Sequence, residues 1–269
     1  MTYLSGLFVY PIKSLGGISV PEATAELRGL KHDRRWMLVD EQGVFVSQRE
    51  VAAMSGLGTA FVDGYLNIFV KNEPGESLCL PLEVPVGAMP QTRVQIWSSR
   101  CNALQYPSEV NRWFSDILNR PLRLVYMPAA TRRRVDGRYA PSGQLVSYAD
   151  AFPYLLIGEA SLTDLQQKLG TSLPMNRFRP NLVVRGTAPF EEDRWSDFCI
   201  GEVPFRGVKP CARCIVVTTD QETGQRDAEP LKTLAGYRKK GNKILFGQNV
   251  VFLGEPGAML RVGDPAFRI

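Results

Sequence analysis

Short apolar segments separated by glycine turns run through the first hundred residues, and they restrict the fold more than any other feature of this sequence. Residues 36–46 hold two apolar runs on either side of a glycine turn, and residues 61–70 hold two on either side of Asp63-Gly64. Short apolar runs joined in this way are typical of β-hairpins. Residues 2–106 are therefore predicted to be mostly β, as a sandwich or a barrel.

The rest of the chain mixes further strands with a few helices. The apolar runs predict strands over 122–127, 152–158, 181–184, 203–208, 215–219, 245–253 and 259–262. Three helices are predicted: one with Ser108 as N-cap, one opened by a capping box at 161–164 and closed by Gly170, and one over 229–239. The fold class is thus mainly β with a few helices.

Residues 128–144 differ from the segments around them, because they are rich in Pro, Gly, Ser and Arg. This composition indicates a loop or a domain junction. We expect one domain over 1–127 and a second over 128–269. Arg132, Arg133 and Arg134 in this loop form a solvated face in the simpler interpretation; the alternative is a flap over an anionic ligand or a docking patch for an acidic partner.

Charge and cysteine content restrict the partners and the compartment. The 269 residues contain 32 Lys and Arg and 27 Asp and Glu, a net charge of +5 that favours an anionic ligand over nucleic acid. Five irregularly spaced cysteines do not resemble a disulfide framework, which indicates a reducing compartment. No signal peptide and no apolar run long enough to cross a membrane are recognisable. We expect a cytoplasmic protein that neither crosses a membrane nor binds nucleic acid.

The chemistry of the chain is further restricted by its single histidine and by one pair of cysteines. His32 alone makes Ser-His-Asp triads, Cys-His pairs and mixed Cys/His zinc sites improbable. Cys211 and Cys214 flank Arg213 at the start of the strand predicted over 215–219, where an adjacent guanidinium favours the thiolate. A Cys-x-x-Cys pair by itself is compatible with half a zinc site, a dithiol redox pair or two buried cysteines, and the last is at least as probable as the others.

Motifs in both halves of the chain together resemble a known family. In the second half they are Asp150-Ala151-Phe152-Pro153, Arg177-Phe178-Arg179-Pro180-Asn181, Cys211-Ala212-Arg213-Cys214, Thr218-Thr219-Asp220, Glu229-Pro230-Leu231-Lys232, Phe246-Gly247-Gln248 and Val262-Gly263-Asp264. These resemble the MOSC domain, named for the C-terminal part of molybdenum-cofactor sulfurase. In the first half they are Val9-Tyr10-Pro11-Ile12-Lys13-Ser14, Gly17 and Asp33-Arg34-Arg35-Trp36. These resemble the β-barrel domain that precedes MOSC.

The resemblance implies a fold, a cofactor and a set of site residues. The fold is a MOSC β-barrel domain after an N-terminal β-barrel-like domain, and the cofactor is the molybdenum cofactor, molybdopterin. Cys214 is implied as the catalytic thiolate that binds molybdenum, and Cys211 as a structural residue. The positions that match cofactor-contacting residues are Lys13, Ser14, Arg34, Arg179 and Arg213, with Asn181 and Asn249 as weaker candidates. Pyridoxal phosphate binding is associated with the family in its description only.

The relatives implied are bacterial reductases of N-hydroxylated compounds and the mitochondrial amidoxime-reducing component. The expected function is therefore a molybdenum-dependent reductase of N-hydroxylated small molecules such as hydroxylaminopurines or amidoximes. Some bacterial relatives continue into a [2Fe–2S] domain and the mitochondrial ones carry a membrane anchor, neither of which this sequence shows. We therefore expect electrons to come from a separate protein.

Three alternatives to a reductase stay open at the level of sequence. One is a carrier that holds the cofactor without turnover. Another is a sulfur carrier in which Cys214 bears a persulfide. The third is a dithiol oxidoreductase, against which the lack of a thioredoxin-like βαβ pattern counts. Glu192 and Asp193 are weak candidates for proton delivery, with a structural role more probable for both.

Overall fold

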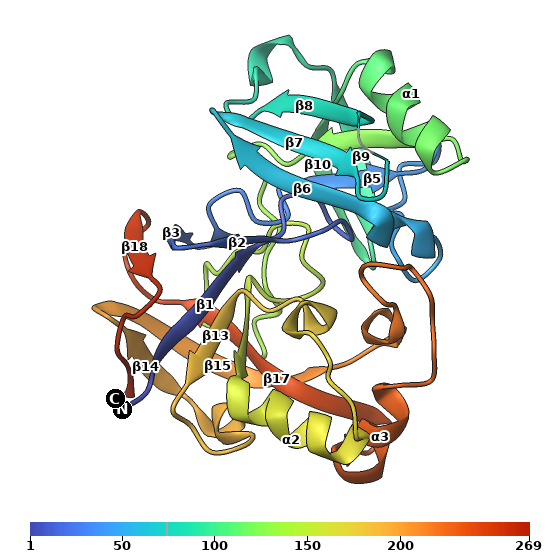
Figure 1. The fold of residues 1–269 in the computed structure, drawn as a ribbon. Helices are drawn as coiled ribbons and strands as arrows, with labels where there is room; N and C mark the ends of the chain where they lie inside the picture. The colour runs from blue at the N-terminus through green and yellow to red at the C-terminus, as the bar shows by residue number, and fades with distance from the viewer. Residues whose placement is uncertain (74) are drawn as a thin grey trace.

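The computed structural model describes residues 1–73 and 75–269 and shows a mainly β protein with three α-helices in that part of the chain (Figure 1). The strands of the first half are β1 Tyr3–Val9, β2 Ile18–Val20, β3 Glu22–Glu26, β4 Gly29–Leu30, β5 Trp36–Val39, β6 Leu57–Val62, β7 Tyr65–Val70, β8 Ser77–Pro81, β9 Gln91–Ile96, β10 Ser99–Gln105 and β11 Arg123–Tyr126. Those of the second half are β12 Tyr154–Gly158, β13 Leu182–Arg185, β14 Asp197–Ile200, β15 Val203–Ala212, β16 Lys239–Lys240, β17 Lys243–Phe252, β18 Ala258–Arg261 and β19 Ala266–Arg268. The helices are α1 Ser108–Ile117, α2 Glu159–Leu169 and α3 Leu231–Tyr237.

The second half is built on one large sheet that closes on itself. Its strand order is β19-β14-β15-β17-β12-β13-β1-β2, with β16 paired to β17. The first strand of the chain, β1, meets the last segment through hydrogen bonds from Leu4 N to Asp264 O and from Ala266 N to Thr2 O. These bonds join the two ends of the sheet, so both termini lie at the same end of a barrel-like body (Figure 1). A barrel leaves few unpaired strand edges.

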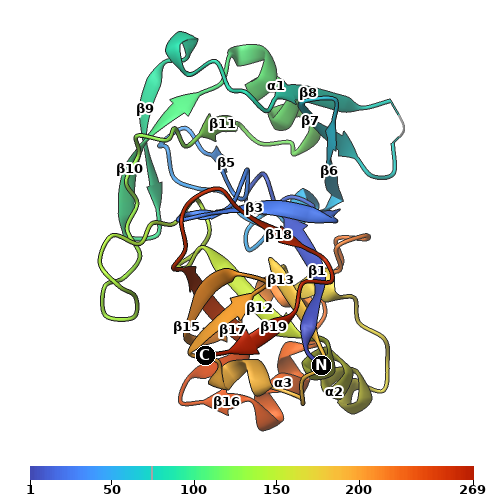
Figure 2. The same ribbon diagram turned by 90° about the vertical axis from the view of Figure 1, so that its left-hand side faces the viewer.

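The first half forms a second β body with its own core. A four-stranded sheet of order β5-β11-β10-β9 faces a three-stranded meander of order β6-β7-β8. Figure 2 shows these strands grouped above the barrel of the second half. Trp36 and Phe114 lie in the buried cluster between them, and the indole of Trp36 donates to Tyr106 Oη at 2.9 Å. The apolar face of α1 is thus part of this core.

Helices α2 and α3 cover one face of the barrel. Phe178 and Phe246 stack there at 4.3 Å between ring centroids, and Leu165 of α2 and Leu234 of α3 belong to the same buried cluster. Among the helices in residues 1–73 and 75–269, none combines the length and the apolar composition that a membrane crossing needs.

Two predicted helix caps are wrong. Pro107, not Ser108, is the N-cap of α1, and no side chain caps it. Helix α2 begins at Glu159, before the predicted capping box, because Ser161 Oγ is engaged elsewhere: it donates to Glu192 at 2.8 Å and accepts from Phe190 N at 2.7 Å. The predicted end at Gly170 is confirmed, since this glycine holds φ +70° as the C-cap. Helix α3 is shorter than 229–239, because Lys239 already belongs to β16.

The strand predicted over 215–219 is also wrong, in a way that moves the site. Strand β15 continues to Ala212, and Ile215–Thr218 then forms a 3₁₀ turn. Thr218 Oγ1 donates to Ile215 O at 2.8 Å, a local bond that competes with strand pairing. β-branched residues favour strands only where packing allows it, and here the turn buries Val217 instead.

The arginine loop is only partly a solvated face. Arg132 and Arg134 are exposed, as that interpretation predicts, but Arg133 is buried. Its Nη1 donates to Ser147 O and Ala149 O, and its Nη2 donates to Asp150 O at 2.8 Å. Arg133 therefore ties the loop to the backbone of 147–150.

Candidate functional site

A cavity of about 270 Å³ lies where the two halves meet, and residues from both halves line it. Its wall includes every residue that the sequence predicted for metal or cofactor binding: Lys13, Ser14, Arg34, Arg179, Asn181, Arg213, Cys214 and Asn249. The described lining holds six cationic side chains, those of Lys13, Arg34, Arg49, Arg179, Lys209 and Arg213. It holds a single carboxylate, that of Asp150. Such an excess of positive charge suits an anionic ligand.

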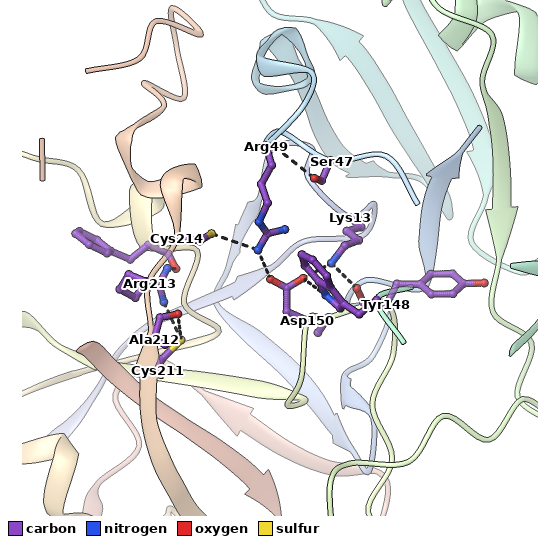
Figure 3. A network of polar contacts seen from close by, with 12 residues as sticks. Lys13, Ser47, Arg49, Tyr148, Asp150, Cys211, Ala212, Arg213 and Cys214 are labelled. Carbon is purple, nitrogen blue, oxygen red and sulfur yellow. Dashed lines mark hydrogen bonds and ion pairs between the residues drawn. The ribbon is translucent and has the colours of Figure 1, made fainter. Parts of the chain in front are cut away.

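Cys214 occupies the turn between β15 and the 3₁₀ helix, one residue before that helix begins. It is not at a strand start, as expected, but just beyond a strand end, where the hydrogen bond from Arg213 N to Ile244 O closes the ladder with β17. The sulfur points toward the first half of the chain, where Arg49 Nη2 approaches Sγ to 3.2 Å (Figure 3).

A charged network links this cysteine to Lys13. Asp150 accepts from Arg49 Nη2 at 2.8 Å through Oδ2 and from Lys13 Nζ at 2.5 Å through Oδ1 (Figure 3). Burial alone would raise the pKa of Asp150, but the charges of Lys13 and Arg49 hold it well below its usual value. Burial lowers the pKa of Lys13 to about 8, although Asp150 opposes this shift.

Arg34 and Arg179 both pack against one buried aromatic ring, that of Tyr10. Their guanidinium carbons are 4.4 and 4.3 Å from the ring centroid of Tyr10. Gly17 permits this packing, because a Cβ there would lie 2.3 Å from Tyr10 Cε1. Burial raises the pKa of Tyr10 to about 12 and lowers that of Arg179 to about 10. Arg179 Nη2 is buried without a partner among the described residues, so this cation lacks the acceptor that a buried guanidinium requires.

Arg34 and Asn181 both donate hydrogen bonds to the buried carboxylate of Asp33. Asp33 accepts from Arg34 Nη1 at 2.7 Å, from Asn181 Nδ2 at 3.0 Å and from Tyr10 N at 2.9 Å. Asn181 Oδ1 in turn accepts from Arg34 Nη1 at 2.8 Å. The amide of Asn181 is thereby committed to protein contacts, and Asn249 likewise donates to Lys209 O at 3.2 Å. Both asparagines line the cavity mainly as supports for its cations.

Three of the predicted residues share an unusual backbone conformation. Ser14, Arg34 and Arg179 hold φ of +71°, +47° and +54°, in the left-handed region that costs non-glycine residues free energy. Strain of this kind persists where the surrounding structure imposes it, and it is concentrated at functional sites. Its occurrence at three cavity residues from separate segments supports a binding role for this surface.

The two cysteines of the Cys-x-x-Cys pair have different guanidinium neighbours. Arg213 Nη1 contacts Cys211 Sγ at 3.2 Å and its Nη2 donates to Phe178 O at 2.7 Å, whereas Cys214 is approached by Arg49. The sequence suggested Arg213 as the guanidinium neighbour of the cysteines, but in the structure Arg213 contacts only Cys211 of the two, and the guanidinium beside Cys214 is that of Arg49. Sequence reasoning missed Arg49, which lies in no motif that we recognised, and it noted Asp150 only as part of a motif.

Comparison with known proteins assigns the chain to a family. Residues 1–121 match the MOSC N-terminal beta barrel domain, and residues 143–266 match the MOSC domain. Mitochondrial amidoxime reducing component 2 of Rattus norvegicus is 34% identical, over 99% of this chain and 83% of that protein. Mitochondrial amidoxime-reducing component 1 of Mus musculus is 32% identical, over 97% and 80%. Molybdenum cofactor sulfurase of Oryza sativa subsp. japonica is 31% identical, over 91% of this chain but only 32% of that longer protein. The chain belongs to the family that joins a MOSC N-terminal β-barrel domain to a MOSC domain and includes the mitochondrial amidoxime-reducing components.

Proposed function

We propose that this protein is a molybdenum-cofactor-dependent reductase of N-hydroxylated small molecules. The buried Nη2 of Arg179, which has no acceptor among the described residues, in a strongly cationic cavity is the observation that carries the proposal. Such a group requires a hydrogen-bond acceptor, and in a cationic cavity the phosphate of molybdopterin suits that place. The names of the relatives, which refer to amidoxime reduction and to the molybdenum cofactor, support the same ligand and reaction.

The residues of the cavity suit the cofactor in two distinct ways. Cys214 offers one soft thiolate ligand, the type of donor that molybdenum takes from a protein. Arg179, Arg34 and Lys13 offer the charged donors that a phosphate requires, with Ser14 and Arg213 beside them. Asn181 and Asn249 hold neighbouring groups in place. When bound, the cofactor would supply the exchange of an oxygen atom and two electrons with the substrate.

The proposed reaction requires electrons and protons to reach the cavity together with the substrate. Reduction of an N-hydroxylated compound breaks the N–O bond, consumes two electrons and two protons, and releases water. The electrons come from a separate donor protein. All five cysteines of the chain are free thiols in the structure, in keeping with the reducing, cytoplasmic environment that we propose for this exchange.

The two carboxylates considered for proton delivery have other roles. Glu192 is buried and accepts from Ser161 Oγ and Gly158 N, and Asp193 pairs with Arg238. Neither lines the cavity, which agrees with the structural interpretation. Asp150 is the single carboxylate in the described lining of the cavity.

The replacement Cys214→Ser tests the proposal, with Cys79→Ser as the control because Cys79 is exposed and outside the cavity. Both variants and the wild type are produced in a host that makes the molybdenum cofactor. We expect near-stoichiometric molybdenum in the wild type and control, loss of molybdenum in Cys214→Ser with its circular dichroism unchanged, and oxidation of a reduced donor only on addition of an N-hydroxylated substrate. Molybdenum and turnover retained by Cys214→Ser would refute the assignment. Bound cofactor without turnover would favour a carrier, and cyanolysable sulfur without metal would favour a sulfur carrier.

A further inference from the structure

Arg49, a residue outside the predicted set, contacts the sulfur of Cys214. Its Nη2 lies 3.2 Å from Cys214 Sγ and 2.8 Å from Asp150 Oδ2, so one guanidinium nitrogen serves both groups. Arg49 lies between β5 and β6 in the first half of the chain, whereas Cys214 follows β15 in the second. An N–H group from the first half is thus directed at the proposed metal ligand in the second half.

Several contacts fix the position of this guanidinium. Its carbon lies 4.6 Å from the ring centroid of Trp97, whose indole Nε1 faces Asp150 Oδ1 at 3.4 Å. Trp97 holds φ +53° at the turn between β9 and β10, and its ring packs against Phe45 at 4.8 Å. Arg226 Nη1 donates to the backbone oxygen of Arg49 at 3.1 Å. A long side chain loses rotamer entropy when it is held in this way, so the fixed geometry points to a role beyond a surface ion pair.

We propose that Arg49 is a positioning residue that donates a hydrogen bond to the Cys214 sulfur and thereby sets the reduction potential of the metal bound there. The inference rests on the proposed function. Hydrogen bonds to a ligating sulfur withdraw electron density from it and favour the reduced metal, as they do in iron–sulfur sites. The positive charge of Arg49 acts in the same direction. Asp150 and Trp97 keep the donor in place.

Arg213 does not offer the same interaction, although it adjoins Cys214 in the sequence. Its guanidinium is committed to Cys211 Sγ and to Phe178 O. Removal of Arg49 therefore leaves Cys214 without a charged donor from the described residues. This makes Arg49 suitable for a single-site test.

The test compares cofactor-loaded wild type with Arg49→Gln, which removes the charge, and Arg49→Lys, which keeps a charge but loses the planar fork. Arg206→Gln is the matched control, because Arg206 also pairs with an aspartate, Asp197, but lies outside the cavity. Molybdenum content is measured first. The midpoint potential of the loaded fraction is then measured by titration of the paramagnetic Mo(V) signal, a property that a merely structural role would not change.

We expect Arg49→Gln to lower the midpoint potential by about 59 mV, which is a tenfold change in the ratio of oxidised to reduced metal for a one-electron step. Arg49→Lys should shift it less and in the same direction, and Arg206→Gln should match the wild type. Potentials of both Arg49 variants equal to that of the wild type would overturn the inference while leaving the proposed function intact. A wild type without molybdenum would refute the proposed function, and the inference with it.

Discussion

Replacement of Asp33 by alanine tests whether the cavity depends on the buried carboxylate behind it. Asp33 is fully buried and accepts three hydrogen bonds, from Tyr10 N, Arg34 Nη1 and Asn181 Nδ2, at 2.7 to 3.0 Å. These donors come from β1's end, from the loop before β5 and from the segment before β13. One side chain thus joins the first segment of the chain to the second half.

The cost of this replacement follows from what is left unpaired. Burial raises the pKa of Asp33 although Arg34 opposes this shift, so keeping the carboxylate charged costs free energy in the wild type. The main loss of stability in Asp33→Ala therefore comes from the buried donors that lose their acceptor. Removing one partner of a buried ion pair costs about 3–5 kcal/mol. For a chain of this size, 1 kcal/mol lowers the melting temperature by about 2–4 °C, which gives a fall of about 6–20 °C.

The measurement is thermal unfolding followed by circular dichroism, with Asp197→Ala as the control. Asp197 makes a bidentate pair with Arg206 at 2.5 and 2.7 Å, but both side chains are more than one-third exposed. Such surface pairs contribute about 0–1 kcal/mol, so the control should melt close to the wild type. Equal melting temperatures for the two variants would contradict the reasoning, since they would show that the buried network adds no more than a surface pair.

Two further predictions concern groups beside the cavity. Arg133→Ala should reduce the free energy of unfolding by about 3 kcal/mol in urea titrations, because its charged hydrogen bonds to three backbone oxygens are lost, while the exposed Arg132→Ala should remain near the wild type. Lys13 loses its proton near pH 8 in the folded protein and near its usual 10.5 in the unfolded chain, so the unfolded state binds more protons between these values. The free energy of unfolding should therefore rise from pH 8 to 10.5 in the wild type relative to Lys13→Met; equal slopes in the two proteins would contradict the assignment.

The sequence predicted the β architecture because its signals are local. The Asp63-Gly64 turn and the alternating runs beside it produce the hairpin of β6 and β7 without help from distant residues. Strands with weaker local signals were missed, such as β10 and the short β2, β3 and β4, which are defined by their partners. The error at Ile215–Thr218 has the same origin, since local β propensity was overridden by packing against α3 and by the end of the β17 ladder.

The same distinction explains the site. The family motifs brought together eight residues that the structure places on one cavity wall, but they carried no information on which groups touch each other there. Arg213 adjoins Cys214 in sequence and contacts Cys211 in space, because the turn after β15 directs the two cysteines to different neighbours. Arg49 is 165 positions from Cys214 and reaches it only because the two halves of the chain meet at the cavity. The charge next to the Cys214 sulfur therefore depends on the contact between the two halves of the chain. Substitutions in the first half, such as those at Arg49, should change the chemistry at Cys214 in the second half.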